Sequence, residues 1–455
     1  MEVIEHLIET VNAWLWNTFL IVVLCGTGVF FTFRLRFVQI RKFGAAWKHL
    51  LRQIFSRDVE RKEGEMTPFQ SLATAIAAQV GTGNLAGAAT ALAGGGPGAI
   101  FWMWMSAFFG MATVYAEATL AQVYKTTVDG EVTGGPTYYI RQAFKGTFGR
   151  VLAVIFAVFL VLALGFMGNM VQANSVSAAF SDALRARGIQ VPGIVIGIVI
   201  AAFAGVIFIG GTDRLAAVVE KFVPMMAVVY ICGSVLLIVM NADRLPGAVS
   251  SIFVGALDPQ AVAGGAAGIT VREAIRYGVA RGLFSNEAGM GSTPHAHARA
   301  NAKNPHEQGL TAMISVFIDT FIVLNLTVFS ILCSGVLGSG KEGIALTQAA
   351  FVEQFGSFGD LFVSICLFFF AFSTILGWHF FGAINAQYLF GKKAVRIYSA
   401  LVVAFIVIGS TLKVDLVWSL ADTFNGLMVV PNAMALLALS GVVARSCRKY
   451  EDQTK

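Results

Sequence analysis

The sequence predicts an all-α integral membrane protein whose two halves insert with opposite orientations. Hydrophobic residues make up 56% of the 455-residue chain and charged residues 13%, with 38 phenylalanines and a mean hydropathy of +0.73. A soluble protein of this composition would lack a polar surface. Between Met66 and Ala116 there is no Asp, Glu, Lys or Arg, and this stretch is long enough for two membrane crossings. The composition therefore excludes a soluble enzyme.

Apolar runs of about 20 residues mark the predicted membrane-spanning helices. We expect eleven of them, at residues 11–33, 68–93, 97–124, 148–178, 191–211, 214–240, 268–293, 308–336, 359–390, 394–411 and 414–442. After the first span, residues 38–57 carry Phe, Trp, Leu and Ile among Arg and Lys at near-helical spacing. This pattern predicts an amphipathic helix on the cytoplasmic leaflet, rather than a solvated linker.

The distribution of Lys and Arg predicts the orientation, because cytoplasmic loops retain an excess of basic residues. Most basic residues fall in alternate loops, beginning with residues 34–62 and ending with residues 445–455. We therefore expect a multi-pass protein of a bacterial-type plasma (inner) membrane, with the N-terminus outside and the C-terminus cytoplasmic. The net charge of +6 belongs to this asymmetry, and without a soluble basic domain we expect no nucleic-acid partner.

Setting the first span aside leaves ten spans, which divide into two sets of five. The predicted organisation is an extra N-terminal helix with the amphipathic helix in residues 1–67, a first repeat in 68–240, and a second repeat with a short cytoplasmic tail in 241–455. Because five is odd, the second set must insert upside down relative to the first, which makes a 5+5 inverted repeat. Each set begins with a span that small and polar residues interrupt, near 81–84 in the first and near 285–291 in the second.

These paired interruptions predict a binding site, since broken helices at corresponding positions are typical of transporters. Unwound backbone inside a membrane persists only where protein or a polar cavity satisfies its hydrogen bonds. In Val80-Gly81-Thr82-Gly83-Asn84 the glycines permit non-helical torsions, and the freed amides at a half-helix N-terminus favour a carboxylate. The preceding half-helix ends in carbonyls that suit a small cation. An α-amino acid and Na⁺ together satisfy both ends.

The second interruption, Ser285 to Gly291, offers donors, acceptors and a carboxylate. We expect its early carbonyls to meet the substrate's amino group, with Phe284 as a wall of the cavity. Glu287 is interpreted as a structural residue that pairs with Arg281 or caps the second half-helix, the alternative being a functional ionisable group. For the first interruption, the alternative is close helix packing through a Gly-x-x-x-Gly pattern.

Three segments resemble the hallmark sequences of the alanine or glycine:cation symporter family. They are Ala78 to Gly87, Gly134 to Tyr139, and Gly282 to Pro294, and the similarity extends along essentially the entire chain. The resemblance implies a member of the amino acid–polyamine–organocation superfamily with the leucine-transporter-type fold. It also implies symport of a small neutral amino acid, alanine or glycine, with co-transported sodium.

The same resemblance implies roles for particular residues. It makes Gly81, Thr82, Gly83, Asn84, Gln172, Thr374 and Trp378 substrate-binding residues, to which the second interruption adds Phe284, Ser285 and Asn286. The first four would hold the substrate carboxylate, and Trp378 would be a lid that limits side-chain size. The plain structural alternatives are a helix–helix hydrogen bond for Gln172 and simple packing for Trp378.

A resemblance to the related neurotransmitter:sodium symporters implies where sodium lies. Val80-Gly81-x-Gly83-Asn84 reproduces the core of the first broken helix in those proteins. By that alignment, Na⁺ would lie between the carbonyls of Ala77 and Val80 and the hydroxyls of Ser373 and Thr374.

Two other function classes compete with sodium symport. One is a proton-coupled amino acid permease of the same fold, with Glu287 or Glu117 carrying the proton. The other is a channel or a membrane enzyme, which the sequence disfavours because channels seldom need paired breaks and no reactive constellation of an enzyme stands out. The choice among alanine, glycine, serine and glutamine, the ion stoichiometry and the oligomeric state stay open at this level.

Overall fold

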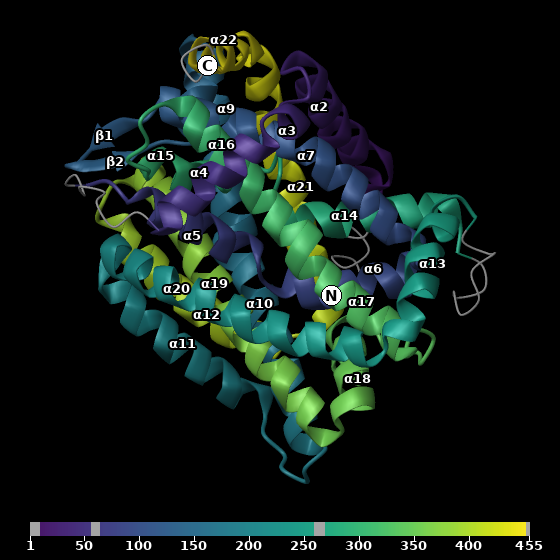
Figure 1. Ribbon diagram of the computed structural model, residues 1–455. Coiled ribbons are helices and arrows are strands. Elements are labelled where there is room, and N and C mark those ends of the chain that lie inside the picture. Colours follow the sequence, from purple (N-terminus) through teal and green to yellow (C-terminus); the bar gives the residue numbers. More distant parts are fainter. Residues whose placement is uncertain (1–9, 56–63, 259–268, 452–455) are drawn as a thin grey trace.

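The computed structural model describes residues 10–55, 64–258 and 269–451, which form a bundle of helices with one small β-hairpin (Figure 1). In the hairpin, β1 (Thr126–Val128) runs antiparallel to β2 (Glu131–Thr133), with Thr126 opposite Thr133.

The helices before residue 260 are α2 (Leu20–Arg34), α3 (Val38–Arg41), α4 (Phe43–Phe55), α5 (Pro68–Gln79), α6 (Ala88–Gly95), α7 (Gly98–Val123), α8 (Pro136–Ala143), α9 (Gly146–Leu160), α10 (Asn169–Arg185), α11 (Gly193–Ile209), α12 (Gly211–Met240) and α13 (Leu245–Leu257). Those after it are α14 (Val271–Asn286), α15 (Pro294–Arg299), α16 (Pro305–Phe317), α17 (Asn325–Ser334), α18 (Gly343–Phe355), α19 (Ser357–Phe390), α20 (Ala394–Gly409), α21 (Val414–Ala438) and α22 (Ser440–Glu451). Short π-helical turns precede or join several of these, namely η1 (Leu15–Phe19), η2 (Gly83–Gly87), η3 (Val161–Gly168) and η6 (Ile318–Leu324), and η4 (Ala242–Arg244) is a 3₁₀ turn.

Many of these helices have the length and composition of membrane spans. Among the described residues, six continuous segments qualify, namely Gly98–Val123, Gly146–Arg185, Arg214–Met240, Pro305–Ser334, Ser357–Phe390 and Leu416–Ala438. Three shorter apolar helices, α2, α11 and α20, coincide with further predicted spans. The chain is thus a multi-pass membrane protein, and the total of eleven spans stays a prediction.

The helices differ in how deeply they lie in the bundle. The most apolar 18-residue stretch is 72% buried in α19 and 67% buried in α7, but only 28% buried in the segment Arg214–Met240. Helix α19 packs against α5, α10 and α12, while α7 packs against α14 and α16. Two central helices therefore flank the interrupted helices, and α12 presents much of its apolar surface outward, as a lipid-facing helix does.

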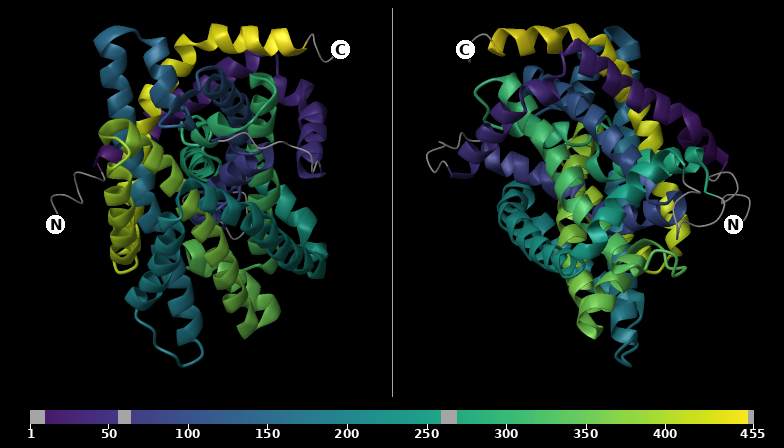
Figure 2. Two further views of the ribbon diagram at one scale, coloured as in Figure 1. Left: turned by 90° about the vertical axis from the view of Figure 1, so that its left-hand side faces the viewer. Right: turned by 45° about the vertical axis from the view of Figure 1, so that its right-hand side comes forward.

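The segment between the first two spans forms α3 and α4, and its last two predicted residues, 56 and 57, lie outside the described ranges. Helix α4 packs along α16, where the rings of Phe43 and Phe317 are 4.8 Å apart and Gln53 Nε2 donates to Thr311 Oγ1 at 3.2 Å. Helix α22 lies across one end of the bundle, where the end of α2 reaches it (Figure 2).

Candidate functional site

The helix that carries the first interruption begins at a capping box and ends in mid-bundle. Thr67 Oγ1 accepts from the Gln70 amide at 3.1 Å, and Gln70 Oε1 accepts from the Thr67 amide at 3.2 Å. Helix α5 ends at Gln79, and Val80 is extended, with φ −83° and ψ 91°. The next turn, η2, begins at Gly83. The backbone is therefore non-helical where the sequence predicts an interruption, and it is buried there.

Protein groups satisfy part of this unwound backbone. The Gly81 amide donates to Asn84 Oδ1 at 3.0 Å, and the Thr82 amide donates to Gln172 Oε1 at 3.2 Å. Two buried side-chain atoms at the same place, Thr82 Oγ1 and Gln172 Nε2, have no hydrogen-bond partner among the described residues. A buried polar atom without a partner costs free energy, so a polar ligand that reaches both atoms would bind favourably.

The two glycines of the interruption are required by close approach. A Cβ on Gly81 would collide with Thr374 Oγ1, and a Cβ on Gly83 would lie 2.9 Å from the Cα of Ser285. The first glycine therefore lets α19 approach the break, and the second lets the two interrupted helices touch.

Four oxygens meet at the C-terminal end of α5, and we call them the carbonyl cluster. Thr374 Oγ1 lies 2.8 Å from the Ala77 carbonyl oxygen, 3.3 Å from that of Val80 and 3.1 Å from that of Phe370. A hydroxyl has one hydrogen, so it donates to one of these three acceptors at a time. The cluster has more oxygens than this hydroxyl can satisfy.

Ser373, which the sequence places beside Thr374 in a sodium site, reaches the carbonyl cluster only through the Phe370 carbonyl. Its Oγ donates to the Phe370 carbonyl at 2.8 Å and lies 3.4 Å from Met226 Sδ. The structure therefore brings Ala77, Val80 and Thr374 together without the Ser373 hydroxyl. The physical reason is that consecutive residues on a helix project about 100° apart, so only one of the two hydroxyls faces α5.

The second interruption is longer and relies on left-handed backbone. Helix α14 ends at Asn286, and α15 begins at Pro294. Between them Glu287, Gly289 and Gly291 have φ of 57°, 86° and 82°. Glycine adopts such torsions without penalty, but Glu287 does so at a cost that its surroundings must offset.

A buried carboxylate from α7 holds the glycines of the second interruption. Glu117 accepts from the amides of Gly289 at 3.2 Å and Gly291 at 3.0 Å, and from Asn432 Nδ2 at 2.6 Å. Asn432 also donates to the Gly289 carbonyl at 2.9 Å and accepts from the Tyr139 hydroxyl at 2.5 Å. These bonds replace the lost helical ones, so Glu117 stabilises the unwound conformation.

Glu287 is fully buried, and its two oxygens accept from Trp378 Nε1 and from Ser292 Oγ. The expected pairing with Arg281 does not form, because Arg281 Nη2 lies 2.5 Å from Asp422 Oδ2 instead. Trp378 is therefore more than a packing residue, since its indole nitrogen is tied to the second interruption.

The two interruptions are connected directly and through Asp319 on η6. Asp319 accepts from Asn84 Nδ2 at 2.7 Å and from Ser285 Oγ at 3.0 Å, so one residue from each interrupted helix binds the same carboxylate. Gln79 Nε2 donates to the Asn286 carbonyl at 2.8 Å. Asp319 is 0% exposed and forms no ion pair with a described residue.

Aromatic rings close the site on one side. The Phe284 ring lies edge-on to Trp378 with centroids 5.9 Å apart, and 4.8 Å from the ring of Trp418. Gly168 leaves room for the indole, because a Cβ there would lie 2.5 Å from Trp378 Cζ3. Phe284 is 5% exposed and Trp378 2%, so the site is shut off from solvent in this conformation.

Sequence reasoning left several of these contacts unassigned. Glu117 was considered only as a proton carrier of the alternative permease, and Asp319 had no assigned role, because a charge within an apolar span signals importance but does not name a partner. The Phe370 carbonyl has no sequence signal, because any residue has one. Asn432 joins the site from the far end of the chain, and nothing in its own segment marks it.

Comparison with known proteins gives a consistent family. A model of the sodium:alanine symporter family matches residues 1–455. The sodium/alanine symporter AgcS of Methanococcus maripaludis is 41% identical over 459 residues, covering 99% of this chain and 98% of AgcS. The probable sodium/glutamine symporter GlnT of Bacillus subtilis is 40% identical, covering 100% of this chain and 92% of GlnT. The amino-acid carrier protein AlsT of Bacillus subtilis is 38% identical, covering 99% and 93%.

Solved structures share the fold at low identity. MhsT in complex with L-phenylalanine superposes with a TM-score of 0.59 at 13% identity, covering 85% of this chain and 98% of MhsT. Mhp1, a nucleobase-cation-symport-1 family transporter, gives a TM-score of 0.53 at 12% identity, covering 85% and 94%. At these identities the likeness concerns the fold alone, and it confirms the predicted leucine-transporter-type fold class.

Proposed function

Because the chain belongs to the sodium:alanine symporter family, we propose that it is a sodium-coupled symporter that imports alanine or glycine by alternating access. It is a transporter and not an enzyme. The observation that carries the proposal is the pair of unpartnered polar atoms, Thr82 Oγ1 and Gln172 Nε2, buried beside unwound backbone among the described residues. An amino acid carries the polar groups that would satisfy both atoms.

The first interruption suits the substrate's carboxylate. The amides from Gly81 to Asn84 lie at the start of a helical segment, where the backbone dipole favours negative charge. Asn84 Oδ1 and Gln172 Oε1 now accept from two of these amides, and a carboxylate would replace these neutral acceptors with a charged one. Gln172 Nε2 and Thr82 Oγ1 would then donate to the same carboxylate.

The end of α14 suits the substrate's ammonium group and limits its side chain. The last carbonyls of that helix, around Phe284, Ser285 and Asn286, have lost the amides that a continuing helix would supply. The rings of Phe284 and Trp378 fill the space next to them. A hydrogen or a methyl group fits such a site more readily than a large side chain, which favours glycine or alanine.

The carbonyl cluster suits Na⁺, which is transported and not retained. Ala77 and Val80 supply carbonyl oxygens of the ended helix, Thr374 supplies its hydroxyl, and the Phe370 carbonyl lies beside it. All four are neutral oxygens, the ligands that a hard cation prefers, and they are buried. We assign Ser373 no direct contact with the ion in this conformation.

Coupling follows from the position of the two ligands. Na⁺ at the carbonyl cluster would hold α19 against α5, and the amino acid would hold α5 against α14. Each ligand therefore orders backbone that the other also binds, so each raises the affinity for the other. The two repeats, 68–240 and 241–455, both contribute helices to this site. Transport would proceed when one bundle of these helices rocks against the remaining helices, which opens the site to each side of the membrane in turn.

Uptake by purified protein in proteoliposomes tests this function. With an inward Na⁺ gradient and no pH gradient, labelled alanine should accumulate above its outside concentration, and a tenfold excess of unlabelled glycine should compete. Accumulation with a proton gradient in Na⁺-free buffer, and none with Na⁺, would contradict sodium coupling. Unsaturable flux would contradict a transporter with a discrete site.

A proton-coupled permease is the second candidate. It is favoured by Glu287 and Glu117, which are both 0% exposed and form no ion pair with a described residue. A buried carboxylate without a cation is stabilised by binding a proton. If Glu287 carries the proton, Glu287→Gln should abolish uptake driven by a pH gradient. If Glu287 is structural, the variant should still take up alanine when a Na⁺ gradient drives it.

We also propose the plasma (inner) membrane as the location, with the N-terminus outside. This is supported by basic residues at one end of the bundle, among them Arg34, Arg36 and Arg448, as cytoplasmic surfaces have. A C-terminal fluorescent-protein fusion should fluoresce, while a C-terminal alkaline phosphatase fusion should be inactive. The reverse pattern would contradict this orientation.

A further inference from the structure

A basic hollow lies where α2 ends and α22 crosses the bundle. It has a volume of about 260 Å³, and eight residues line it, none of them acidic. Four of the eight are arginines, namely Arg34, Arg36, Arg41 and Arg448. Arg34, Arg36 and Arg448 are exposed, and their positive charges around one small hollow repel each other, so an anion inside it would lower the electrostatic free energy.

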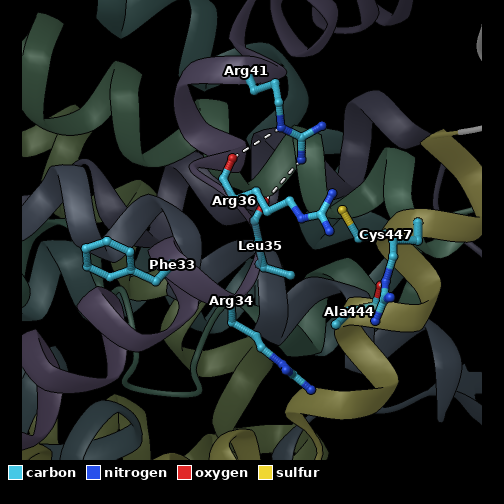
Figure 3. Close-up of a pocket in the computed structure, with 8 residues that line it drawn as sticks. Phe33, Arg34, Leu35, Arg36, Arg41, Ala444 and Cys447 are labelled. Atoms are coloured by element: carbon cyan, nitrogen blue, oxygen red, sulfur yellow. Dashed lines mark hydrogen bonds between the residues drawn. The ribbon is translucent and has the colours of Figure 1, made fainter.

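The arginines are contributed by three helices, α2, α3 and α22, and by the turn that follows α2. Figure 3 shows Arg34 and Arg36 extending from the end of α2 towards α22, which carries Cys447 on the opposite wall. Both Arg34 and Arg36 are exposed, and neither forms an ion pair with a described residue. Their guanidinium groups are thus available to a ligand.

The turn that presents Arg36 is held in an unusual conformation. Arg36 and Phe37 both have φ of 55°, in the left-handed region that non-glycine residues seldom adopt. Arg41 fixes this turn, because its guanidinium donates to the carbonyls of Leu35 at 3.1 Å and Arg36 at 3.2 Å (Figure 3). Strained backbone maintained by specific bonds is common where a protein holds a ligand.

Phe33 lines the basic hollow, and two further exposed apolar side chains lie on the segment that carries Arg36 and Arg41. Phe33 is 64% exposed, Phe37 38% and Ile40 61%, and the rings of Phe33 and Phe37 meet edge-on at 5.2 Å. In a membrane protein, exposed apolar side chains at the end of a span contact the acyl chains next to the headgroups. The hollow therefore joins a strongly basic surface to a lipid-facing one.

We infer that this hollow binds the phosphate headgroup of an anionic phospholipid, with its acyl chains against Phe33, Phe37 and Ile40. Arg34 and Arg36 bind the phosphate from the α2 side and Arg448 from α22, since guanidinium groups match phosphate oxygens in geometry and charge. Bound in this way, the lipid fastens α22 to the end of α2. The apolar border favours a lipid over free phosphate, which would use the arginines alone.

Native mass spectrometry of the purified full-length protein in detergent tests the site. Phosphatidylglycerol should bind more tightly than phosphatidylcholine with the same acyl chains, and inorganic phosphate at millimolar concentration should compete only weakly. Each basic group near an anionic headgroup strengthens association roughly fivefold, so Arg34→Gln with Arg36→Gln should weaken phosphatidylglycerol binding about 25-fold.

A matched variant controls for overall charge. Arg150 and Arg396 are exposed residues on other helices, so Arg150→Gln with Arg396→Gln removes the same charge outside the hollow and should leave binding within about twofold of the wild type. Arg448→Gln tests the opposite wall independently, in case the α2 variant does not fold, and should weaken binding roughly fivefold.

Three results would overturn the inference. One is equal loss of phosphatidylglycerol binding in the control and hollow variants. Another is equal affinity for phosphatidylglycerol and phosphatidylcholine. The third is displacement of the lipid by inorganic phosphate at equal concentration, which would make the hollow a site for soluble anions.

Discussion

Removal of the Thr374 hydroxyl is the most direct way to perturb sodium binding. It lies 2.8 Å from the Ala77 carbonyl and 3.3 Å from that of Val80, at the end of a helix whose last carbonyls lack helical partners. Thr374→Val removes this oxygen and retains the β-branched shape. Thr374→Ser removes only a methyl group and keeps the oxygen.

The size of the effect follows from losing one buried ligand of a cation. A hydrogen bond to a charged group contributes about 1.5–3 kcal/mol, and we take a neutral oxygen bound to Na⁺ to contribute a similar amount. This corresponds to an increase of about 10- to 150-fold in the Na⁺ concentration that half-saturates uptake. Thr374→Ser should stay within about fivefold of the wild type.

The matched control is the neighbouring hydroxyl. Ser373 Oγ contacts the Phe370 carbonyl and Met226 Sδ and forms no hydrogen bond to the Ala77 or Val80 carbonyl, so Ser373→Ala should change sodium half-saturation by less than about threefold. The assay is the initial rate of labelled alanine uptake into proteoliposomes as a function of external Na⁺. Thermal unfolding with and without Na⁺ provides a second readout, because an ion that binds only the folded protein raises the unfolding temperature.

Two outcomes would refute this reasoning. If Thr374→Val has wild-type sodium dependence and wild-type stabilisation by Na⁺, the ion does not bind at the carbonyl cluster. If Ser373→Ala shifts sodium dependence as much as Thr374→Val, the hydroxyl orientations seen here do not represent the ion-bound protein.

Three further predictions concern the interrupted helices. Gly83→Ala should nearly abolish uptake, because its Cβ would lie 2.9 Å from Ser285 Cα. The control Gly87→Ala, whose Cβ would have its nearest neighbour at 3.9 Å, should keep uptake and not lower the unfolding temperature. Equal effects in the two variants would support general helix packing instead. Asp319→Asn should raise sodium half-saturation at least about tenfold, since it removes one of the acceptor oxygens that link Asn84 to Ser285, and unchanged sodium dependence would contradict this. Trp378→Phe keeps an aromatic ring but loses the bond to Glu287, so uptake should fall several-fold, and wild-type rates would show that the indole only packs.

Much of the fold is visible in the sequence, because a membrane imposes strong rules on local composition. Apolar runs placed the segments that form α7, α12 and α19 to within a few residues. The interruption at Val80 to Gly83 was visible for the same reason, since glycines and polar residues seldom cluster in the middle of a continuous span. The direction in which a side chain leaves a helix is harder to predict from sequence. Which of the neighbouring hydroxyls, Ser373 or Thr374, contacts α5 is known only once the packing of α19 against α5 is known.

The candidate site depends on contacts that join distant parts of the chain. Glu117 and Asn432 meet at the glycines of the second interruption although 315 positions separate them in the sequence. Sequence reasoning left Glu287 either to pair with Arg281 or to cap the second half-helix, but Arg281 pairs with Asp422, and Glu287 accepts from Trp378. Such pairings are decided by which helices pack together, a tertiary property without a local signal.

The central claim is that Na⁺ and an amino acid complete the same pair of facing interruptions. The most direct test is the dissociation constant of alanine for the purified protein in Na⁺ and in K⁺, together with that of Na⁺ with and without alanine. We predict at least about tenfold tighter alanine binding in Na⁺ and the same factor for Na⁺ in the presence of alanine, as linkage requires. Alanine binding of equal strength in Na⁺ and K⁺ would contradict it.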